Sequence, residues 1–442
     1  MPASRIDIRW LRYSRMALTA ILMAACILLW DVAQGLEVAV ALLVAYLTAH
    51  AAYVRWRHAS NAGSAVLLAA WAWLALLAVA FLWASSRGSY SLEWPHLQSD
   101  MNGYFCWAVH HHNGCVPEPK MMFTGWPRAI VALWTLLGQS LVWPVALNVA
   151  LTLMALVLTA RLAAALWQGR TSTRRSSVAT WAMALTAVLG FWMAEGALLL
   201  KEPSVYVAVL LAALAMARLL TPDAGRPRLA PALLLFAAGA FILAAVRAKY
   251  VNFLFFGALL VWCADFRRNA KPAAALLLIT ALCWWLGMEM GSHYTVTVQL
   301  KNITSSQEMG QAMDGTQGAA ALFPDYYRYP EWKRVLMLPV SCAVQCIIPL
   351  PWLPSWSSLT LLNIAPRLQL GWYLVAAMAM WFYVRHWRRL DRQLRCWALF
   401  APVCFILIAY MTGGRVSRYI LPFQPLITAL IAVVPARKFL KP

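Results

Sequence analysis

The sequence predicts an all-α polytopic integral membrane protein, and three observations support this fold class. Of the 442 residues, 62% are hydrophobic and only 12% are charged, and the mean hydropathy is +0.64. Apolar runs of roughly 17–25 residues recur along the chain, and this is the length that a membrane-spanning helix requires. The short segments of alternating apolar and polar residues that are typical of a transmembrane β-barrel do not occur in the sequence.

The basic residues have a distribution that predicts the topology. The chain has 37 Lys and Arg residues against 16 Asp and Glu residues, and its formal net charge is +21. Most of the basic residues lie in short segments between apolar runs, as the positive-inside rule predicts for cytoplasmic loops. This distribution favours membrane anchoring over nucleic-acid binding. The segments are "SRIDIRWLRYSR", "YVRWRH", "QGRTSTRRSS", "DFRRNAK", "RHWRRLDRQLR" and "ARKFLKP".

The alternation of apolar runs and basic segments predicts about twelve transmembrane helices, with both termini in the cytoplasm. The first apolar run lacks a small-residue cleavage site and is therefore expected to be a retained span. Residues 128–140 and 335–358 are apolar but short or interrupted by proline, so they are expected to lie in the membrane interface. The spans are expected near residues 16–35, 37–54, 64–85, 140–165, 178–197, 203–219, 229–247, 250–264, 273–288, 368–385, 396–412 and 419–436.

The same topology divides the chain into regions. Residues 1–63 are expected to hold an N-terminal cytoplasmic segment and two additional spans. Residues 64–436 are expected to form the main transmembrane domain, and residues 437–442 a cytoplasmic tail. Within the main domain, residues 86–127 form the first outer loop and residues 289–367 form a long outer loop.

Several charged residues depart from the positive-inside trend, because they lie at predicted outer tips beside or within a span. A charge at the middle of a membrane costs about 2.5–3.5 kcal/mol, so such charges are commonly functional or paired. Helix capping and the snorkelling of long basic side chains are the structural alternative. Because four separate tips carry such charges, the sequence favours a site on the outer face. The residues are Asp100, Glu195, Lys201, Glu202, Arg247, Lys249, Arg415 and Arg418.

The first outer loop contains a candidate catalytic helix. At helical spacing, Asp100, Tyr104, Ala108 and His111 fall near one face. The carboxylate of Asp100 could take a proton from an incoming hydroxyl group. The arginines at the other outer tips could hold a phosphate, because guanidinium groups make bidentate contacts with phosphate oxygens. A carboxylate and arginines at a membrane surface suit a lipid phosphate ester as the substrate, with phosphate as the leaving group.

Two of the nine cysteines, Cys106 and Cys115, share this first outer loop. They could form a disulfide if that side of the membrane is oxidising. A zinc site with His110, His111 and His112 is the competing interpretation, and free thiols are the third. Adjacent histidines do not easily ligate one ion together, and the chain has no Cys-x-x-Cys pair. The sequence therefore predicts no metal site.

Five stretches, taken in order along the chain, resemble the GT-C superfamily of membrane glycosyltransferases. They are "SDMNGYFCWA", "RAIVALWTLLGQSLVWPVALNVALTLMALVLTARLAAAL", "LLLKEPSVYVAVLLAALA", "VRAKYVNFLFF" and "TGGRVSRYILPFQPLITAL". They are similar to the family's first-loop acid and aromatic, its surface helix and following span, its Lys-Asp/Glu-Pro hairpin tip, its arginine-tyrosine segment and its Gly-x-x-x-Arg-Tyr-x-x-Pro-x-x-Pro stretch. The nearest groups are the glycosyltransferase family 39-type enzymes, which resemble dolichyl-phosphate-mannose protein mannosyltransferases, and the bacterial aminoarabinose transferases.

The resemblance implies a GT-C-like bundle, a polyprenyl-phosphate sugar donor and an acceptor met on the outer face of a bacterial inner membrane. It implies that Asp100 is the catalytic base. It also implies that Tyr104, Glu202 and the basic residues of the outer tips contact the substrates, with Glu202 as a second acid or a structural partner of Lys201. The basic residues are Lys201, Arg247, Lys249, Arg415 and Arg418.

The chain departs from the family in ways that shape the expected function. Asp100 stands between Ser99 and Met101, whereas the family has two adjacent acids, so a divalent metal has no paired-acid motif to bind. The chain ends just after the last span, which favours a glycan or lipid acceptor over a protein. Three other functions remain open. They are a polysaccharide polymerase or ligase using Arg328 and Arg334, a transporter or flippase of lipid-linked glycans, and a non-enzymatic assembly partner.

Overall fold

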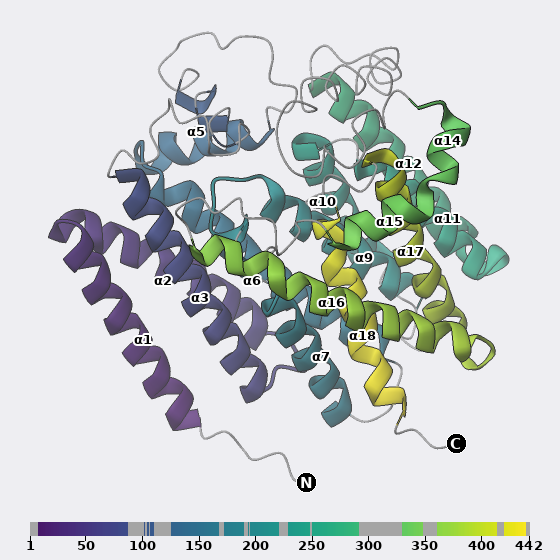
Figure 1. The fold of residues 1–442 in the computed structure, drawn as a ribbon, viewed down its shortest axis with the longest axis horizontal. Coiled ribbons are helices and arrows are strands. Elements are labelled where there is room, and N and C mark those ends of the chain that lie inside the picture. The colour runs from purple at the N-terminus through teal and green to yellow at the C-terminus, as the bar shows by residue number, and fades with distance from the viewer. Residues whose placement is uncertain are drawn as a thin grey trace.

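The computed structural model is all-helical throughout the residues that it describes (Figure 1). These are residues 8–86, 101, 104–105, 107–109, 125–167, 172–189, 193, 195–220, 229–247, 250–290, 329–347, 360–412 and 420–438. Eight of the described helices are long and apolar enough to cross a membrane. The fold class of an all-α membrane protein is therefore confirmed, and the count of twelve spans stays a prediction.

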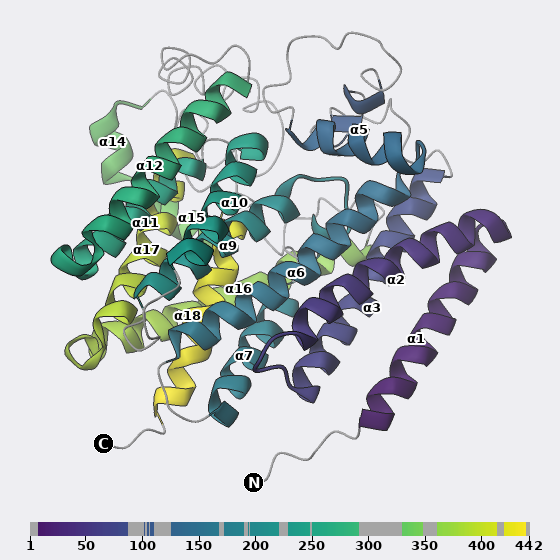
Figure 2. The same cartoon turned by 180° about the vertical axis from the view of Figure 1, so that it is seen from behind.

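The N-terminal helices form an antiparallel layer at one edge of the bundle (Figures 1 and 2). Asp31 separates α1 from α2, because its carboxylate caps α2 by accepting a 2.8 Å hydrogen bond from the backbone N–H of Gln34. The first two helices therefore begin earlier than the ranges predicted for them. The helices are α1 (Ile8–Leu29), α2 (Val32–Val54) and α3 (Asn61–Ser86).

The middle of the chain supplies the core of the bundle. In the most apolar 18-residue stretch of α9, 83% of the residues are buried inside the protein, compared with 17% in the corresponding stretch of α1. Helix α9 is therefore central and α1 is peripheral. Helix α6 packs on α2, α7 and α9, and α9 also packs closely on α10. The helices are α5 (Gly125–Leu137), α6 (Val142–Leu166), α7 (Ser172–Ala187), α9 (Glu202–Leu220), α10 (Leu229–Arg247), α11 (Val251–Ala264) and α12 (Phe266–Met290).

The C-terminal helices complete the bundle, and α18 packs against α6, α7 and α16. Figure 1 shows α16 running obliquely across the front of the molecule. The elements are α14 (Glu331–Leu336), α15 (Leu338–Ile347), α16 (Thr360–Arg385), η4 (Trp387–Arg389), α17 (Arg392–Thr412), η6 (Leu421–Phe423) and α18 (Gln424–Lys438).

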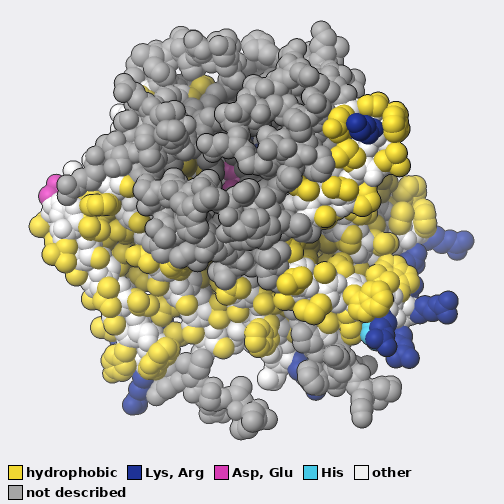
Figure 3. Space-filling model, in the orientation of Figure 1, with side chains coloured by type: hydrophobic (Ala, Val, Ile, Leu, Met, Phe, Trp, Pro, Cys, Tyr) yellow, Lys and Arg dark blue, Asp and Glu magenta, His cyan; other side chains and the backbone are white. Residues whose placement is uncertain are grey.

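Both ends of the described chain lie at the same end of the bundle, because α1 begins and α18 ends at the lower end in Figure 1. An even number of membrane crossings is required for this arrangement, which is consistent with eight or twelve spans. The described basic segments follow α2 and α16 and begin α7, α12 and α17. Figure 3 shows hydrophobic side chains on the exposed flank, with most of the visible Lys and Arg side chains at its lower and right-hand margins.

The two apolar segments expected at the membrane interface form short helices. Helix α5 has 13 residues, and α14 and α15 have 6 and 10. One face of α5 is buried through Trp126, Ile130 and Trp134, whereas Leu136 is exposed. Helix α5 therefore covers the upper ends of α6 and α10, consistent with the interfacial position expected for this part of the chain (Figure 2).

One predicted span is wrong in its boundary. A helix was expected over 178–197, but α7 ends at Ala187 and the chain turns at Val188 and Leu189. The residues from Glu195 to Lys201 then form a short, mostly non-helical segment that packs against α6 and leads into α9.

Candidate functional site

A buried polar cluster lies where the 195–201 segment meets the ends of α6, α9 and α10. Asn148 on α6 holds the segment in place, because its amide nitrogen donates hydrogen bonds to the carbonyl oxygens of Leu198, at 2.5 Å, and Leu200, at 2.8 Å. Irregular backbone at membrane depth needs such partners, since no water is available to satisfy its polar groups. The fully buried Asn148 side chain therefore explains how a break in the helices is tolerated here.

Gly196 allows the segment to lie directly against α6. A Cβ atom at Gly196 would meet Oγ1 of Thr152 at 2.4 Å, which is closer than real contacts allow. Thr152 is itself fixed, because its hydroxyl donates to the carbonyl oxygen of Asn148 at 2.8 Å. The close approach brings Glu195 and Lys201, at the two ends of the segment, into the protein interior.

Glu202 and Arg247 form a buried ion pair between the start of α9 and the end of α10. Arg247 Nη1 lies 2.8 Å from Glu202 Oε1, and the two side chains are 3% and 1% exposed. The second carboxylate oxygen of Glu202 is buried and has no hydrogen-bond partner among the described residues. The guanidinium of Arg247 also lies 5.3 Å from the ring of Tyr250. Glu202 therefore neutralises Arg247 and keeps one oxygen that can accept a further hydrogen bond.

A second buried contact joins Glu195 to α9. The Tyr206 hydroxyl donates a 2.6 Å hydrogen bond to Glu195 Oε2, and both side chains are buried. Tyr206 also interacts electrostatically with Glu202 and Tyr250, so the two contacts belong to one cluster. This cluster consists of Glu195, Lys201, Glu202, Tyr206 and Arg247, and we call it the buried acid–base cluster.

Lys201 connects the buried acid–base cluster to the first long loop. Its Nζ lies 5.1 Å from the ring centroid of Tyr104, and both side chains are 4% exposed. The described residues between 101 and 109 are helical, and Tyr104 and Ala108 are buried as their predicted common face requires. Phe105 packs edge-on against Trp134 of α5, with ring centroids 5.7 Å apart. Helix α5 and this helical turn therefore lie over the cluster.

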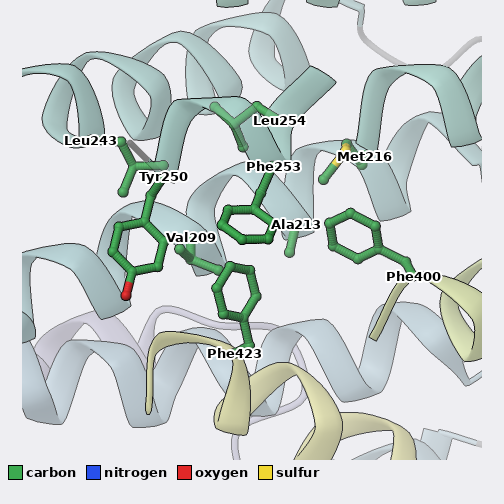
Figure 4. Close-up of a pocket in the computed structure, with 9 residues that line it drawn as sticks. All are labelled: Val209, Ala213, Met216, Leu243, Tyr250, Phe253, Leu254, Phe400 and Phe423. Atoms are coloured by element: carbon green, nitrogen blue, oxygen red, sulfur yellow. The ribbon is translucent and has the colours of Figure 1, made fainter. Parts of the chain in front are cut away.

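An apolar pocket adjoins the cluster, because Tyr250, whose ring lies beside the Arg247 guanidinium, is one of its lining residues. Figure 4 shows aromatic rings from three parts of the chain lining it, with Met216 and aliphatic side chains completing the wall. Phe253 and Phe423 pack with centroids 4.9 Å apart, and Tyr250 lies 5.9 Å from each of them. The lining residues are Val209, Ala213, Met216, Leu243, Tyr250, Phe253, Leu254, Phe400 and Phe423.

The arrangement combines the chemical groups that a phosphate ester and a hydroxyl group need. Lys201 and Arg247 supply positive charge, Glu195 and Glu202 supply carboxylates, and Tyr206 supplies a hydroxyl group, all with little exposure to water. Electrostatic interactions are stronger at such a dry site than in water. A network of this composition can also be purely structural, because buried ion pairs occur without a ligand.

The structure places some of the predicted site residues together. Tyr104, Lys201, Glu202 and Arg247, from three separate stretches of sequence, meet in or beside the cluster. Glu202 pairs with Arg247 rather than with Lys201, so its interpretation as a partner of Lys201 is not supported. Other predicted residues lie outside the described residues. They are Asp100, Cys106, Cys115, Lys249, Arg415 and Arg418, together with His110, His111, His112 and Arg328.

Arg334, proposed with Arg328 for a polymerase, lies on α14 with its guanidinium 5.7 Å from the ring of Tyr410. No group of three or more metal-ligating side chains occurs among the described residues. Among those residues, the free cysteines lie within helices or at their ends.

Sequence reasoning missed Tyr206, Asn148 and Gln424. Tyr206 lies four residues after Glu202 on the same helix face, a spacing that could have indicated it. Asn148 is a polar residue within an apolar run, and such residues commonly have a partner. Gln424 is fully buried at the start of α18, and its side-chain amide makes no hydrogen bond to any described residue.

Comparisons of the chain with protein-family models, with curated proteins and with solved structures find no match. The functional assignment therefore depends on the chemistry of the buried acid–base cluster and on its position in the bundle.

Proposed function

We propose that the chain is a GT-C-like membrane glycosyltransferase. It would move a sugar from a polyprenyl-phosphate donor to a glycan or lipid acceptor. The single observation that carries the proposal is the buried acid–base cluster. Two carboxylates and two cations, each at most 4% exposed, meet at one end of a membrane-type bundle. Placing four charges there is costly unless they pair or act on a ligand.

The cations would act on the phosphate. As the bond between the anomeric carbon and the phosphate oxygen breaks, negative charge accumulates on the departing phosphate. Lys201 would stabilise that charge as a point charge, and Arg247 would contribute once Glu202 yields part of its contact. Glu202 then keeps Arg247 in place while the site is empty, which is the role of a positioning residue.

The acceptor would be activated by Asp100. Its carboxylate would take the proton of the acceptor hydroxyl while that oxygen forms the new bond to the anomeric carbon. Support for this role comes from the helical turn that follows Asp100 in the sequence. That turn presents Tyr104 to Lys201, at the cationic part of the cluster. No metal enters this scheme.

The proposed orientation places the cluster at the periplasmic face of a bacterial inner membrane, with both termini in the cytoplasm. The described basic segments lie at the opposite end of the bundle from Lys201 and Arg247. This separation is what the positive-inside rule predicts for such an orientation.

Native mass spectrometry of the purified protein with undecaprenyl phosphate tests the donor class. We expect the wild type to bind one equivalent and Lys201→Gln to bind about tenfold more weakly, because one charge-assisted contact is lost. The matched control is Arg388→Gln, which removes an exposed positive charge at the opposite end. Equal binding by Lys201→Gln and the control would contradict the proposed phosphate site.

Turnover tests the catalytic role. Asp100→Asn should retain donor binding and lose most transfer of sugar to any acceptor that the wild type uses, because the base is removed. If the wild type binds no polyprenyl phosphate, the two remaining functions that use lipid-linked glycans are also contradicted.

A further inference from the structure

A second charged site lies at the opposite end of the bundle from the buried acid–base cluster. An arginine lies just after α2, near the end of α6, near the start of α7 and near the end of α9, and α6 packs against each of the other three helices. The turn between α2 and α3 is held against α7 by a 3.0 Å hydrogen bond between the hydroxyls of Ser60 and Thr180. We call the set of Arg57, Arg161, Arg175 and Arg218 the arginine corner.

Contacts between helices fix two of these guanidinium groups. Arg161 Nη2 donates to the carbonyl oxygen of Ala52 at 3.3 Å, which ties α6 to the end of α2. Arg175 Nε donates to the carbonyl oxygen of Ala164 at 2.9 Å, which ties α7 to the end of α6. Both acceptors belong to the last turn of a helix, where carbonyl groups lack intrahelical partners. These two arginines are therefore held in place and cannot simply move into solvent.

The four arginines form two electrostatically interacting pairs. Arg161 experiences the positive charge of Arg218, and Arg175 experiences that of Arg57. The ring of Trp56 lies 6.0 Å from the Arg161 guanidinium and 5.9 Å from the ring of His58, and His58 in turn experiences the charges of Arg175 and Arg57. Burial, together with Arg175 and Arg57, lowers the pKa of His58. Protonation of this imidazole, which would add a further positive charge, is therefore disfavoured.

Carboxylates of the described residues do not balance the charge at the arginine corner. None of the four arginines forms an ion pair with a carboxylate among the described residues. Each helix terminus contributes about half a charge, so the C-termini of α2, α6 and α9 and the N-termini of α3 and α7 together supply roughly half a negative charge. Four guanidinium groups exceed that by far. Helix-end stabilisation alone therefore does not account for the cluster.

We propose that the arginine corner binds the phosphate headgroup of an anionic phospholipid. The corner lies at the end of membrane-type helices, where phospholipid headgroups occur, and basic pockets between such helices are suited to them. Guanidinium groups match phosphate oxygens in geometry. Exposed apolar side chains on the same helices, such as Val54 on α2 and Trp181 on α7, offer surface for acyl chains.

The proposal is tested by lipid titration of the delipidated protein, with bound lipid measured by native mass spectrometry. The probes are phosphatidylglycerol, phosphatidylcholine and inorganic phosphate. The test variant is Arg57→Gln/Arg218→Gln, because these two arginines form no hydrogen bond or ion pair with any described residue and their loss should leave the helix contacts intact. The matched control is Arg388→Gln/Arg389→Gln, which removes two exposed charges from η4.

We expect the wild type and control to bind phosphatidylglycerol in preference to phosphatidylcholine, and the test variant to bind it at least about tenfold more weakly. Lys201→Gln should leave this binding unchanged, which separates it from the proposed donor site. If millimolar inorganic phosphate displaced phosphatidylglycerol, the arginine corner would still be a phosphate site, but its ligand would be a soluble phosphate and the lipid proposal would be overturned. An equal loss of phosphatidylglycerol binding in the test and control variants would overturn the proposal, because the overall positive charge of this face would then explain the binding. Equal melting temperatures of the variants in phosphatidylcholine would confirm that folding is intact.

Discussion

The two ends of the bundle hold charge in opposite ways. The buried acid–base cluster combines acids and bases, and its ion pair is 3% and 1% exposed. The arginine corner contains one sign of charge only, with Arg57 and Arg218 exposed and Arg161 and Arg175 partly so. Where water is excluded, each charge needs a partner of opposite sign within the protein. Where headgroups and water are near, like charges are tolerated and can wait for an external anion. This difference predicts how unequally the two ends respond to mutation.

Breaking the buried ion pair should have the largest effect. Arg247→Ala leaves the Glu202 carboxylate buried without its partner, so we expect a loss of about 3–5 kcal/mol in unfolding free energy. Unfolding in mixed detergent and denaturing micelles measures it. The double variant Glu202→Leu/Arg247→Met, which removes both charges, should recover most of that loss. If the single and double variants are equally destabilised, charge burial is not the cause.

Removing the Tyr206 hydroxyl should come next. Tyr206→Phe deletes a 2.6 Å hydrogen bond to a buried carboxylate, so we expect a loss of about 1.5–3 kcal/mol. The same unfolding measurement applies. Tyr53→Phe is a control at the opposite end, because the Tyr53 hydroxyl accepts a 3.0 Å hydrogen bond from the Ser60 backbone N–H and bonds no charged group among the described residues. Its cost should be smaller, and a larger cost would reverse the comparison.

The close approach of Gly196 to α6 should be the next most sensitive feature. Gly196→Ala places a methyl group against Thr152, and overpacking of this kind costs about 1–3 kcal/mol. Thr152→Ala in the same chain should reduce that cost, because it removes the atom in closest contact. The double-mutant cycle measures the coupling between the two positions, and additive effects would show that the segment moves away freely.

Mutation at the arginine corner should have the smallest effect on stability. Arg57→Gln removes an exposed charge, so we expect a change within about 0.5 kcal/mol. The experiment is thermal unfolding in a neutral lipid, compared with Arg247→Ala. A large loss for Arg57→Gln would show that this end is also a folded ion network.

Acidification provides a related test at the same end. The pKa of His58 is lowered from its ordinary value of 6.5, mainly by burial and also by Arg175 and Arg57. The unfolded chain then binds this proton more readily than the folded protein. The stability that the neutral His58 contributes is therefore fully present above pH 6.5 and is lost as the pH falls below 6.5. The melting temperature of the wild type should fall more between pH 7.5 and 5.5 than that of His58→Asn. An equal fall in both proteins would exclude His58 as a source of this pH dependence.

Much of the fold follows from the sequence for a simple physical reason. A helix in a membrane must be apolar and long, so composition and length reveal it locally. Each predicted span overlaps a described helix, although α7 is shorter than predicted. That boundary depends on Asn148 and Gly196, whose contacts lie about 50 residues apart in the chain, so no local pattern shows it.

The candidate site was predictable in position but not in pairing. Charges at helix ends against the positive-inside trend identified Lys201, Glu202 and Arg247. The partner of Glu202 depends on how α9 and α10 are rotated against each other, and periodicity leaves that rotation open. The hydrogen bond from Tyr206 to Glu195 likewise depends on how the 195–201 segment folds back on α9, although the spacing of Tyr206 from Glu202 was visible in the sequence.

The helical hairpin of α1 and α2 has a consequence for how the protein can be shortened. The hairpin enters and leaves the membrane on the same side, and Gly35 packs its two arms together against the backbone near Cys26. Deleting both helices together would preserve the sidedness of every later helix. Deleting α1 alone would require either that the rest of the chain invert or that one helix fail to insert, so this truncation should yield less folded protein than the deletion of both helices.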